Sequence, residues 1–141
     1  MADIILDKEG INKVYEEVRN DNEAITWMCV SEKDKKLQVT ASGENFDDIG
    51  ELLDDSIREY FFIRLTVGDE LSKRTKFALV TWIGNNCGPL KKGLIMHEKP
   101  KIRECIQNVA VELTFSDISE FTQSAIEEAI RKAGGANYGR G

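Results

Sequence analysis

Residues 59–67 read EYFFIRLTV and residues 77–83 read FALVTWI. Both stretches are rich in aromatic and branched residues, so each predicts a central strand that is buried on much of both faces. Between them, Gly68 and Asp69 begin a turn. Two long strands joined by a short connection predict an antiparallel pair at the centre of a sheet.

Weaker patterns before this pair predict a helix, a hairpin and a second helix. Apolar residues recur at helical spacing over residues 8–19, and Asp7 is a suitable N-cap. Residues 24–30 and 37–41 favour two strands that turn at Asp34 and Lys35. Apolar positions between residues 46 and 53 indicate a second short amphipathic helix.

After the pair, Pro100 fits the first turn of a helix. Lys99, Lys101 and Arg103 would then crowd its N-terminal end, where cations oppose the helix macrodipole. Because cations that oppose the macrodipole would cost stability, their presence there indicates a binding role. Residues 111–115 predict an edge strand, and a last helix is expected from about 118 to 132, with Gly134 as its left-handed cap.

This order of elements predicts a mixed α/β or α+β domain, with four or five strands and helices on both faces of the sheet. The chain has 141 residues, which suits one domain. We assign that domain to residues 1–133 and a flexible C-terminal tail to residues 134–141, GGANYGRG.

Composition indicates a globular protein of the cytoplasm. Hydrophobic residues make up 41% and charged residues 31% of the chain, and no apolar run approaches the roughly 20 residues of a membrane span. The N-terminus lacks the basic region of a secretory signal. Three widely spaced cysteines, Cys29, Cys87 and Cys105, indicate reduced thiols and not a disulfide framework.

The sequence gives little support for catalysis. His97 is the only histidine and is expected in a loop, which excludes a histidine-based metal cluster. No phosphate-binding loop occurs, and the acidic pairs at 47–48 and 54–55 do not have EF-hand spacing. We therefore expect no enzyme activity, no cofactor and no metal site.

Charge is distributed unevenly along the chain, whose net charge is −6. Residues 71–103 hold eight basic residues and one acid, a net +7, which leaves −13 for the rest. The cations either solvate exposed loops or form a face for an anionic partner. Nucleic acid fits poorly with a pI of about 4.9, phosphoinositide head groups stay open, and an acidic protein fits best.

Residues 69–84, DELSKRTKFALVTWIG, resemble the coactosin branch of the actin-depolymerising-factor homology family. Residues 18–21 (VRND), 106–109 (IQNV) and 133–138 (AGGANY) are also similar to that branch, so the resemblance covers nearly the whole chain. It implies a central mixed, mostly antiparallel sheet of five or six strands with helices on both faces.

The resemblance also implies actin binding without catalysis. Coactosins bind the filament more than the monomer, and are associated with countering barbed-end capping and not with severing. A monomeric protein of the cytoplasmic actin cytoskeleton is expected. The start, Met-Ala-Asp, lacks the regulatory serine of cofilins, so inhibition by that phosphorylation is not expected. Two alternatives stay open: an adaptor for a non-actin protein or the actin branch-junction complex, and a lipid-regulated sensor.

By position, the resemblance assigns filament contacts to three groups of residues. The basic motif before the second central strand is the first group, basic positions of the family's long helix are the second, and the last helix supplies the third. These residues are Lys73, Arg74 and Lys76; Lys99 and Arg103; and Glu127, Glu128, Arg131 and Lys132.

Overall fold

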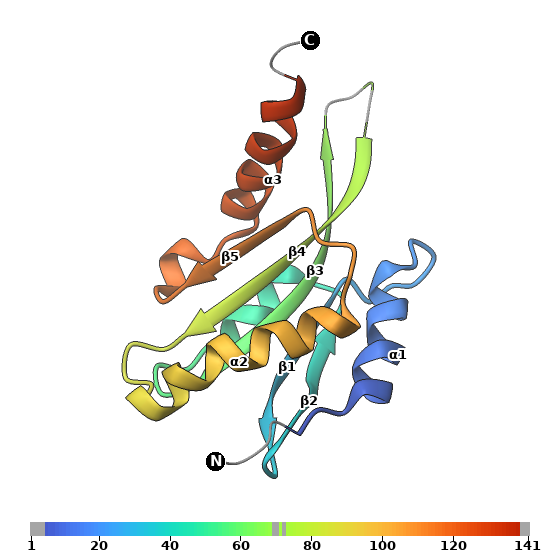
Figure 1. Ribbon diagram of the computed structural model, residues 1–141. Coiled ribbons are helices and arrows are strands. Elements are labelled where there is room, and N and C mark those ends of the chain that lie inside the picture. The colour runs from blue at the N-terminus through green and yellow to red at the C-terminus, as the bar shows by residue number, and fades with distance from the viewer. Residues whose placement is uncertain (1–4, 69–70, 72, 139–141) are drawn as a thin grey trace.

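The computed structural model describes residues 5–68, 71 and 73–138, and forms one five-stranded sheet with helices on both faces (Figure 1). In chain order the elements are α1 (Lys8–Arg19), β1 (Trp27–Lys33), β2 (Lys36–Gly43), the 3₁₀ helix η1 (Phe46–Leu52), β3 (Arg58–Gly68), β4 (Lys73–Ile83), α2 (Pro89–Cys105), β5 (Val111–Phe115), the 3₁₀ helix η2 (Ile118–Glu120) and α3 (Gln123–Tyr138).

The predicted central pair is confirmed as β3 and β4. The two strands are antiparallel and stay in register from Arg58 opposite Ile83 to Gly68 opposite Lys73. The sheet order is β2-β1-β3-β4-β5, in which only β5 lies parallel to its neighbour, after a crossover through α2. The sheet is therefore mixed and mostly antiparallel, as predicted.

Alternate residues of the central strands fill two separate cores, because successive side chains of a strand point to opposite faces. Tyr60 and Phe62 pack with α1 and α2 on one face. Phe61 and Ile63 pack with η1 and α3 on the other. Both faces of β3 are thus buried, which explains why its apolar run is continuous.

The N-terminal elements also agree with the sequence. The Asp7 carboxylate accepts a hydrogen bond from the Gly10 amide, which caps α1. Asp34 and Lys35 both have positive φ, as a two-residue hairpin turn requires. Before α1, the chain bridges to the outer edge of β2 through two backbone hydrogen bonds with Leu37.

The long helix α2 begins at Pro89, and the prediction that it begins at Pro100 was wrong. Pro100 lies inside the helix on its exposed side. Proline has no amide hydrogen to donate to the carbonyl of Met96, but Met96 is exposed, so water can reach that carbonyl. Lys99, Lys101 and Arg103 therefore lie toward the C-terminal end of α2, where the macrodipole favours cations.

The C-terminal helix also differs from the prediction. Residues 118–120 form η2, and α3 follows from Gln123, with the Thr122 hydroxyl accepting a hydrogen bond from the Ala125 amide. Gly134 is not the left-handed cap that was predicted, because the helix continues through it to Tyr138. Residues 134–138 of the predicted tail are thus helical, and residues 139–141 lie outside the described residues.

One carboxyl group is buried at the start of β3. Glu59 is 4% exposed, and its Oε2 accepts a hydrogen bond from the Cys29 thiol at 3.4 Å, while its Oε1 has no partner. Burial raises the pKa of Glu59 to about 7, the Cys29 hydrogen bond lowers it, and the charge of Asp54 adds to the rise. The protonated form is therefore favoured in the folded protein.

This group predicts a pH-dependent stability. Because the folded pKa of about 7 lies above the ordinary 4.5, the folded state holds a proton that the unfolded state releases between these values. The contribution of Glu59 to the free energy of unfolding is fully present below pH 4.5. It is lost as the pH rises through about 7, by about 3 kcal/mol at most. Glu59→Gln should remove this loss.

Urea unfolding of the parent and of Glu59→Gln at about pH 5 and about pH 8 measures the effect. We expect the variant to gain about 2–3 kcal/mol relative to the parent between these two conditions. A stability difference that does not change with pH would contradict the assignment.

Candidate functional site

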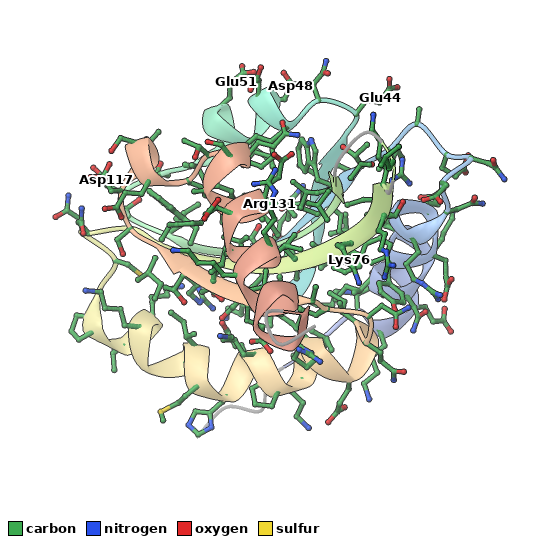
Figure 2. The ribbon with its side chains drawn as sticks, turned by 90° about the horizontal axis from the view of Figure 1, so that it is seen from above. Glu44, Asp48, Glu51, Lys76, Asp117 and Arg131 are labelled. Atoms are coloured by element: carbon green, nitrogen blue, oxygen red, sulfur yellow. The ribbon has the colours of Figure 1, made fainter. Side chains whose placement is uncertain are left out.

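All predicted contact residues except Lys73 fall into two groups on opposite faces of the sheet. Ala78 and Val80 of β4 pack with α3, so strand alternation places Arg74 and Lys76 on that same face. Figure 1 shows that the far end of the β3–β4 pair and the C-terminal part of α3 extend at the same end of the molecule. Figure 2 looks onto this end, with Lys76 and Arg131 both labelled there.

We call this first group the β4–α3 cluster. Its members are Arg74, Lys76, Glu127, Glu128, Arg131 and Lys132. Arg131 lies 3.9 Å from Glu127 and 3.6 Å from Glu128 in ion pairs along the helix. Arg74 and Lys76 form no ion pair within the described part of the chain. The strand cations are therefore available to an external anion.

Lys73 lies apart from this cluster. It is the first residue of β4, opposite Gly68, and alternation points it to the α1–α2 face. It is exposed and, among the described residues, has no carboxylate partner. The basic motif thus presents cations on both sides of a strand end.

The second group, which we call the α2–β5 cluster, contains Lys99, Arg103 and an acid that the sequence did not single out. The carboxylate of Glu112 in β5 forms ion pairs with Lys99 at 3.4 Å and with Arg103 at 2.6 Å. Both cations are thus partly neutralised by the same carboxylate. Sequence reasoning missed this partner because Glu112 joins α2 only through the parallel pairing of β4 with β5.

The exposed side of α2 carries apolar side chains that sequence reasoning also missed. Leu90 is 86% exposed, Leu94 is 37% exposed and Met96 is 72% exposed. They lie on the same helix as the cations of the α2–β5 cluster. A correct start for α2 at Pro89 would have identified them, because buried residues of this helix recur at 95, 98 and 102.

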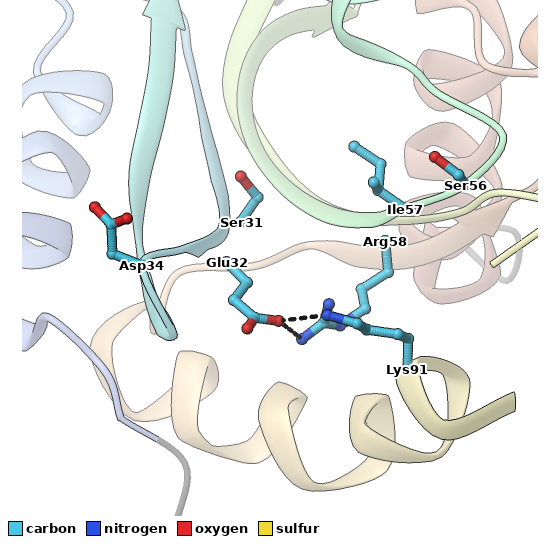
Figure 3. Close-up of a pocket in the computed structure, with 7 residues that line it drawn as sticks. All are labelled: Ser31, Glu32, Asp34, Ser56, Ile57, Arg58 and Lys91. Atoms are coloured by element: carbon cyan, nitrogen blue, oxygen red, sulfur yellow. Dashed lines mark hydrogen bonds and ion pairs between the residues drawn. The ribbon is translucent and has the colours of Figure 1, made fainter. Parts of the chain in front are cut away.

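A buried ionic network fixes α2 on the sheet. Glu98 of α2 is 3% exposed, and its carboxylate accepts hydrogen bonds from Arg58 Nε at 3.0 Å, from Arg58 Nη2 at 2.5 Å and from Tyr60 OH at 2.7 Å. Arg58 Nη2 also donates to Glu32 at 3.0 Å, and Lys91 of α2 donates to the same oxygen at 3.1 Å (Figure 3). Nε and Nη2 of Arg58 are therefore both engaged by carboxylates.

These contacts change the protonation equilibria of the network. Burial opposes the charge on Arg58, but hydrogen bonds and charge from Glu98 and Glu32 outweigh it and raise its pKa. The hydrogen bond from Lys91 lowers the pKa of Glu32. Burial, together with the hydrogen bond to Glu98, raises the pKa of Tyr60. Arg58 thus stays charged, Glu32 stays ionised and Tyr60 stays neutral near neutral pH.

A pocket of about 300 Å³ opens beside this network, between the end of β1 and the start of β3. Figure 3 shows that Glu32 points toward both Arg58 and Lys91 within it. Three of its charged lining residues, Glu32, Arg58 and Lys91, are already paired with one another. We therefore assign the pocket a structural role and not a ligand site.

Removing one partner of this buried pair should destabilise the protein strongly. Glu98→Gln leaves the Arg58 guanidinium buried beside a neutral amide, and we expect a loss of about 3–5 kcal/mol in urea unfolding. Glu32→Gln is the matched control, because Glu32 is more exposed, and should cost about 1 kcal/mol or less. The prediction fails if both variants lose the same amount.

The comparisons with known proteins agree with the fold and with the resemblance. The sequence profile of the family described as "Cofilin/tropomyosin-type actin-binding protein" matches residues 4–131. Coactosin-like protein of Bos taurus is 36% identical over 133 residues, which cover 94% of each chain.

Two solved structures give the same result. The crystal structure of human coactosin-like protein superposes with a TM-score of 0.88 at 32% identity, over 92% of this chain and 99% of the human one. The solution structure of mouse coactosin, described as an actin filament binding protein, superposes with a TM-score of 0.80 at 34% identity, over 97% of this chain and 96% of the mouse one. The chain therefore belongs to the cofilin/tropomyosin-type actin-binding proteins, and within them to the coactosin branch.

Proposed function

We propose that the protein binds the sides or ends of actin filaments through the β4–α3 cluster and the adjacent Lys73. We propose further that it counters barbed-end capping, with little severing or monomer binding. The observation that carries this proposal is that Lys73, Arg74 and Lys76 form no ion pair within the described residues of an acidic chain. Actin is acidic, so these cations meet carboxylates and speed encounter.

The β4–α3 cluster has the rigidity that such a surface needs. Lys76 stands opposite Leu65 in the regular β3–β4 ladder, and the neighbouring Ala78 is fully buried. Ile126 and Ile130 of α3 are buried in the same core, which fixes the helix that carries Arg131 and Lys132. Because strand and helix share one core, little ordering entropy is lost when both contact a partner.

The preference for the filament rests on the difference between the two clusters. In the α2–β5 cluster, Glu112 already neutralises part of the charge of Lys99 and Arg103. These two residues therefore contribute less to an electrostatic contact than the unpaired strand cations do. Weak attraction along the long helix is consistent with weak monomer binding, and filament contact then depends mainly on β4 and α3.

The remaining parts of the proposal follow from this binding mode. The protein acts as a monomer in the cytoplasmic actin cytoskeleton, by binding and not as an enzyme, and nucleic acid is not its partner. Phosphoinositide head groups would compete for the same cations, since they too are polyanions. None of the described helices is both long and apolar enough to cross a membrane.

The test of the filament surface is Lys76→Ala. The substitution removes an unpaired cation from a half-buried strand position, and we expect co-sedimentation with filaments to weaken by about tenfold or more, as for a central interface residue. Lys13→Ala is the matched control, because Lys13 is an exposed cation of α1. The filament surface is misplaced if Lys76→Ala pellets like the parent while its thermal unfolding is also unchanged.

A separate prediction tests the neutralising acid. Glu112→Gln frees Lys99 and Arg103 without removing either cation, and should strengthen filament binding by roughly two- to fivefold at low salt. The gain should shrink as salt increases, because exposed charges are screened. Unchanged or weaker co-sedimentation of this variant would mean that the α2–β5 cluster does not face the filament.

The proposed effect against barbed-end capping is measured in a separate experiment. Elongation of filaments in the presence of a barbed-end capping protein, followed with labelled actin, should be faster when the parent protein is added. Lys76→Ala should lose this effect in parallel with its binding. If the variant binds weakly and still restores elongation, the two activities use different surfaces.

A further inference from the structure

An apolar groove lies between η1 and the start of α3, on the sheet face opposite α2. It has a volume of about 160 Å³ and is lined mainly by Phe46, Ile49, Gly50, Phe121 and Thr122. None of these residues belongs to either cluster described above. A hollow of this size suits one large apolar side chain.

The floor of the groove is held rigidly by aromatic packing. The Phe121 ring packs edge-on against Phe46 and Phe61, with ring centroids 5.9 Å and 5.4 Å apart, and stacks on Phe115 with centroids 5.2 Å apart. Phe121 and Ile49 are buried in the core shared with α3. At Gly50 the absent side chain leaves open space, because a Cβ there would meet nothing within 4 Å. The groove is therefore preformed.

The two chain segments that line this groove carry acidic residues and no basic ones. Residues 41–57 and 111–130 contain no lysine and no arginine. Figure 2 shows Asp48 and Glu51 on η1, Glu44 before this helix and Asp117 beside η2. Asp47 lines the groove itself. The exposed acids of these two segments that form no ion pair within the described residues are Glu44, Asp47, Asp48, Glu51, Asp54, Asp55, Asp117 and Glu120.

These carboxylates are not neutralised within the described part of the chain. None of them forms an ion pair there. Asp54 and Asp117 accept hydrogen bonds only from neighbouring serines, Ser56 and Ser119, which lower the pKa of each acid. The rim thus stays anionic and repels an acidic surface.

We infer that this groove binds a basic segment of a partner protein, with one large apolar side chain anchored between lysines or arginines. The apolar floor accepts the anchor, and the acidic rim attracts the flanking cations. Charge of this sign excludes nucleic acid and anionic membranes. The cations of the proposed filament surface, Arg74 and Lys76, are not among the residues that line this groove.

The probe for this site is a fluorescein-labelled synthetic peptide, KKRWRKK, and its matched control is KKRSRKK. Fluorescence anisotropy with the full chain should show tighter binding of the tryptophan peptide, by about tenfold, since only this peptide has an anchor. Binding of both peptides should weaken with added salt. Equal affinity for the two peptides, or no binding of either, would overturn the inference.

Two variants locate the site. Gly50→Lys places a cation at a lining residue of the groove, where a side chain has open space, and should weaken binding of the tryptophan peptide about tenfold or more. Asn12→Lys adds the same charge at an exposed position of α1 on the opposite face, and should have little effect. Equal losses in the two variants would show attraction by net charge alone, which also overturns the inference.

A third variant guards against misfolding. Asp47→Asn with Glu51→Gln removes two exposed rim charges without adding bulk, and should weaken the peptide and reduce its salt dependence. Thermal unfolding of each variant should match the parent. All variants should co-sediment with actin filaments like the parent, so failure at the groove is separable from failure of the proposed filament surface.

Discussion

The register of β3 against β4 determines where every functional group of this protein lies. These strands pair without interruption from Arg58 opposite Ile83 to Gly68 opposite Lys73. At one end this pairing places Arg58 against the buried carboxylate of Glu98 in α2. At the other end it extends the basic motif beyond the body of the sheet. A slip of one residue would exchange the two faces, because alternate side chains serve separate cores.

Charge separation is a second organising feature, and it operates at three levels of burial. The Arg58–Glu98 pair is buried and fixes the position of α2. The pairs made by Glu112 are partly exposed and moderate the cations of α2. The strand cations and the acids around η1 are left without ionic partners in the described residues, on separate regions of the surface. Buried pairs serve architecture here, while unpaired charge is left for binding.

Sequence reasoning predicted the sheet because its signals are local. Continuous apolar strands, the Asp7 cap and the turn at Asp34 and Lys35 each depend on neighbouring residues. It misplaced the start of α2 because Pro100 resembles a first-turn proline, and because the buried stripe of this helix includes the charged Glu98. The partner of Glu98 lies forty positions away on β3, and such a distant pairing has no local signal.

The same limit applies to the candidate sites. The strand cations stood out in the sequence, but the carboxylate that moderates the α2 cations is brought near by a parallel crossover. The groove beside η1 combines residues from positions 46–50 and 121–123, which meet only through the core. Composition showed an acidic remainder, whereas its concentration around an apolar hollow required the structure.

The bridge between the residues before α1 and Leu37 affects how this sheet meets other chains. An exposed strand edge invites a further strand to pair with it, which leads to aggregation. Here the N-terminal segment occupies backbone groups on the outer edge of β2, and the opposite edge is the five-residue strand β5. Extension of the sheet by a neighbouring chain is thereby discouraged at both edges. Recognition is left to side chains, and so can be altered by substitution while the backbone scaffold remains unchanged.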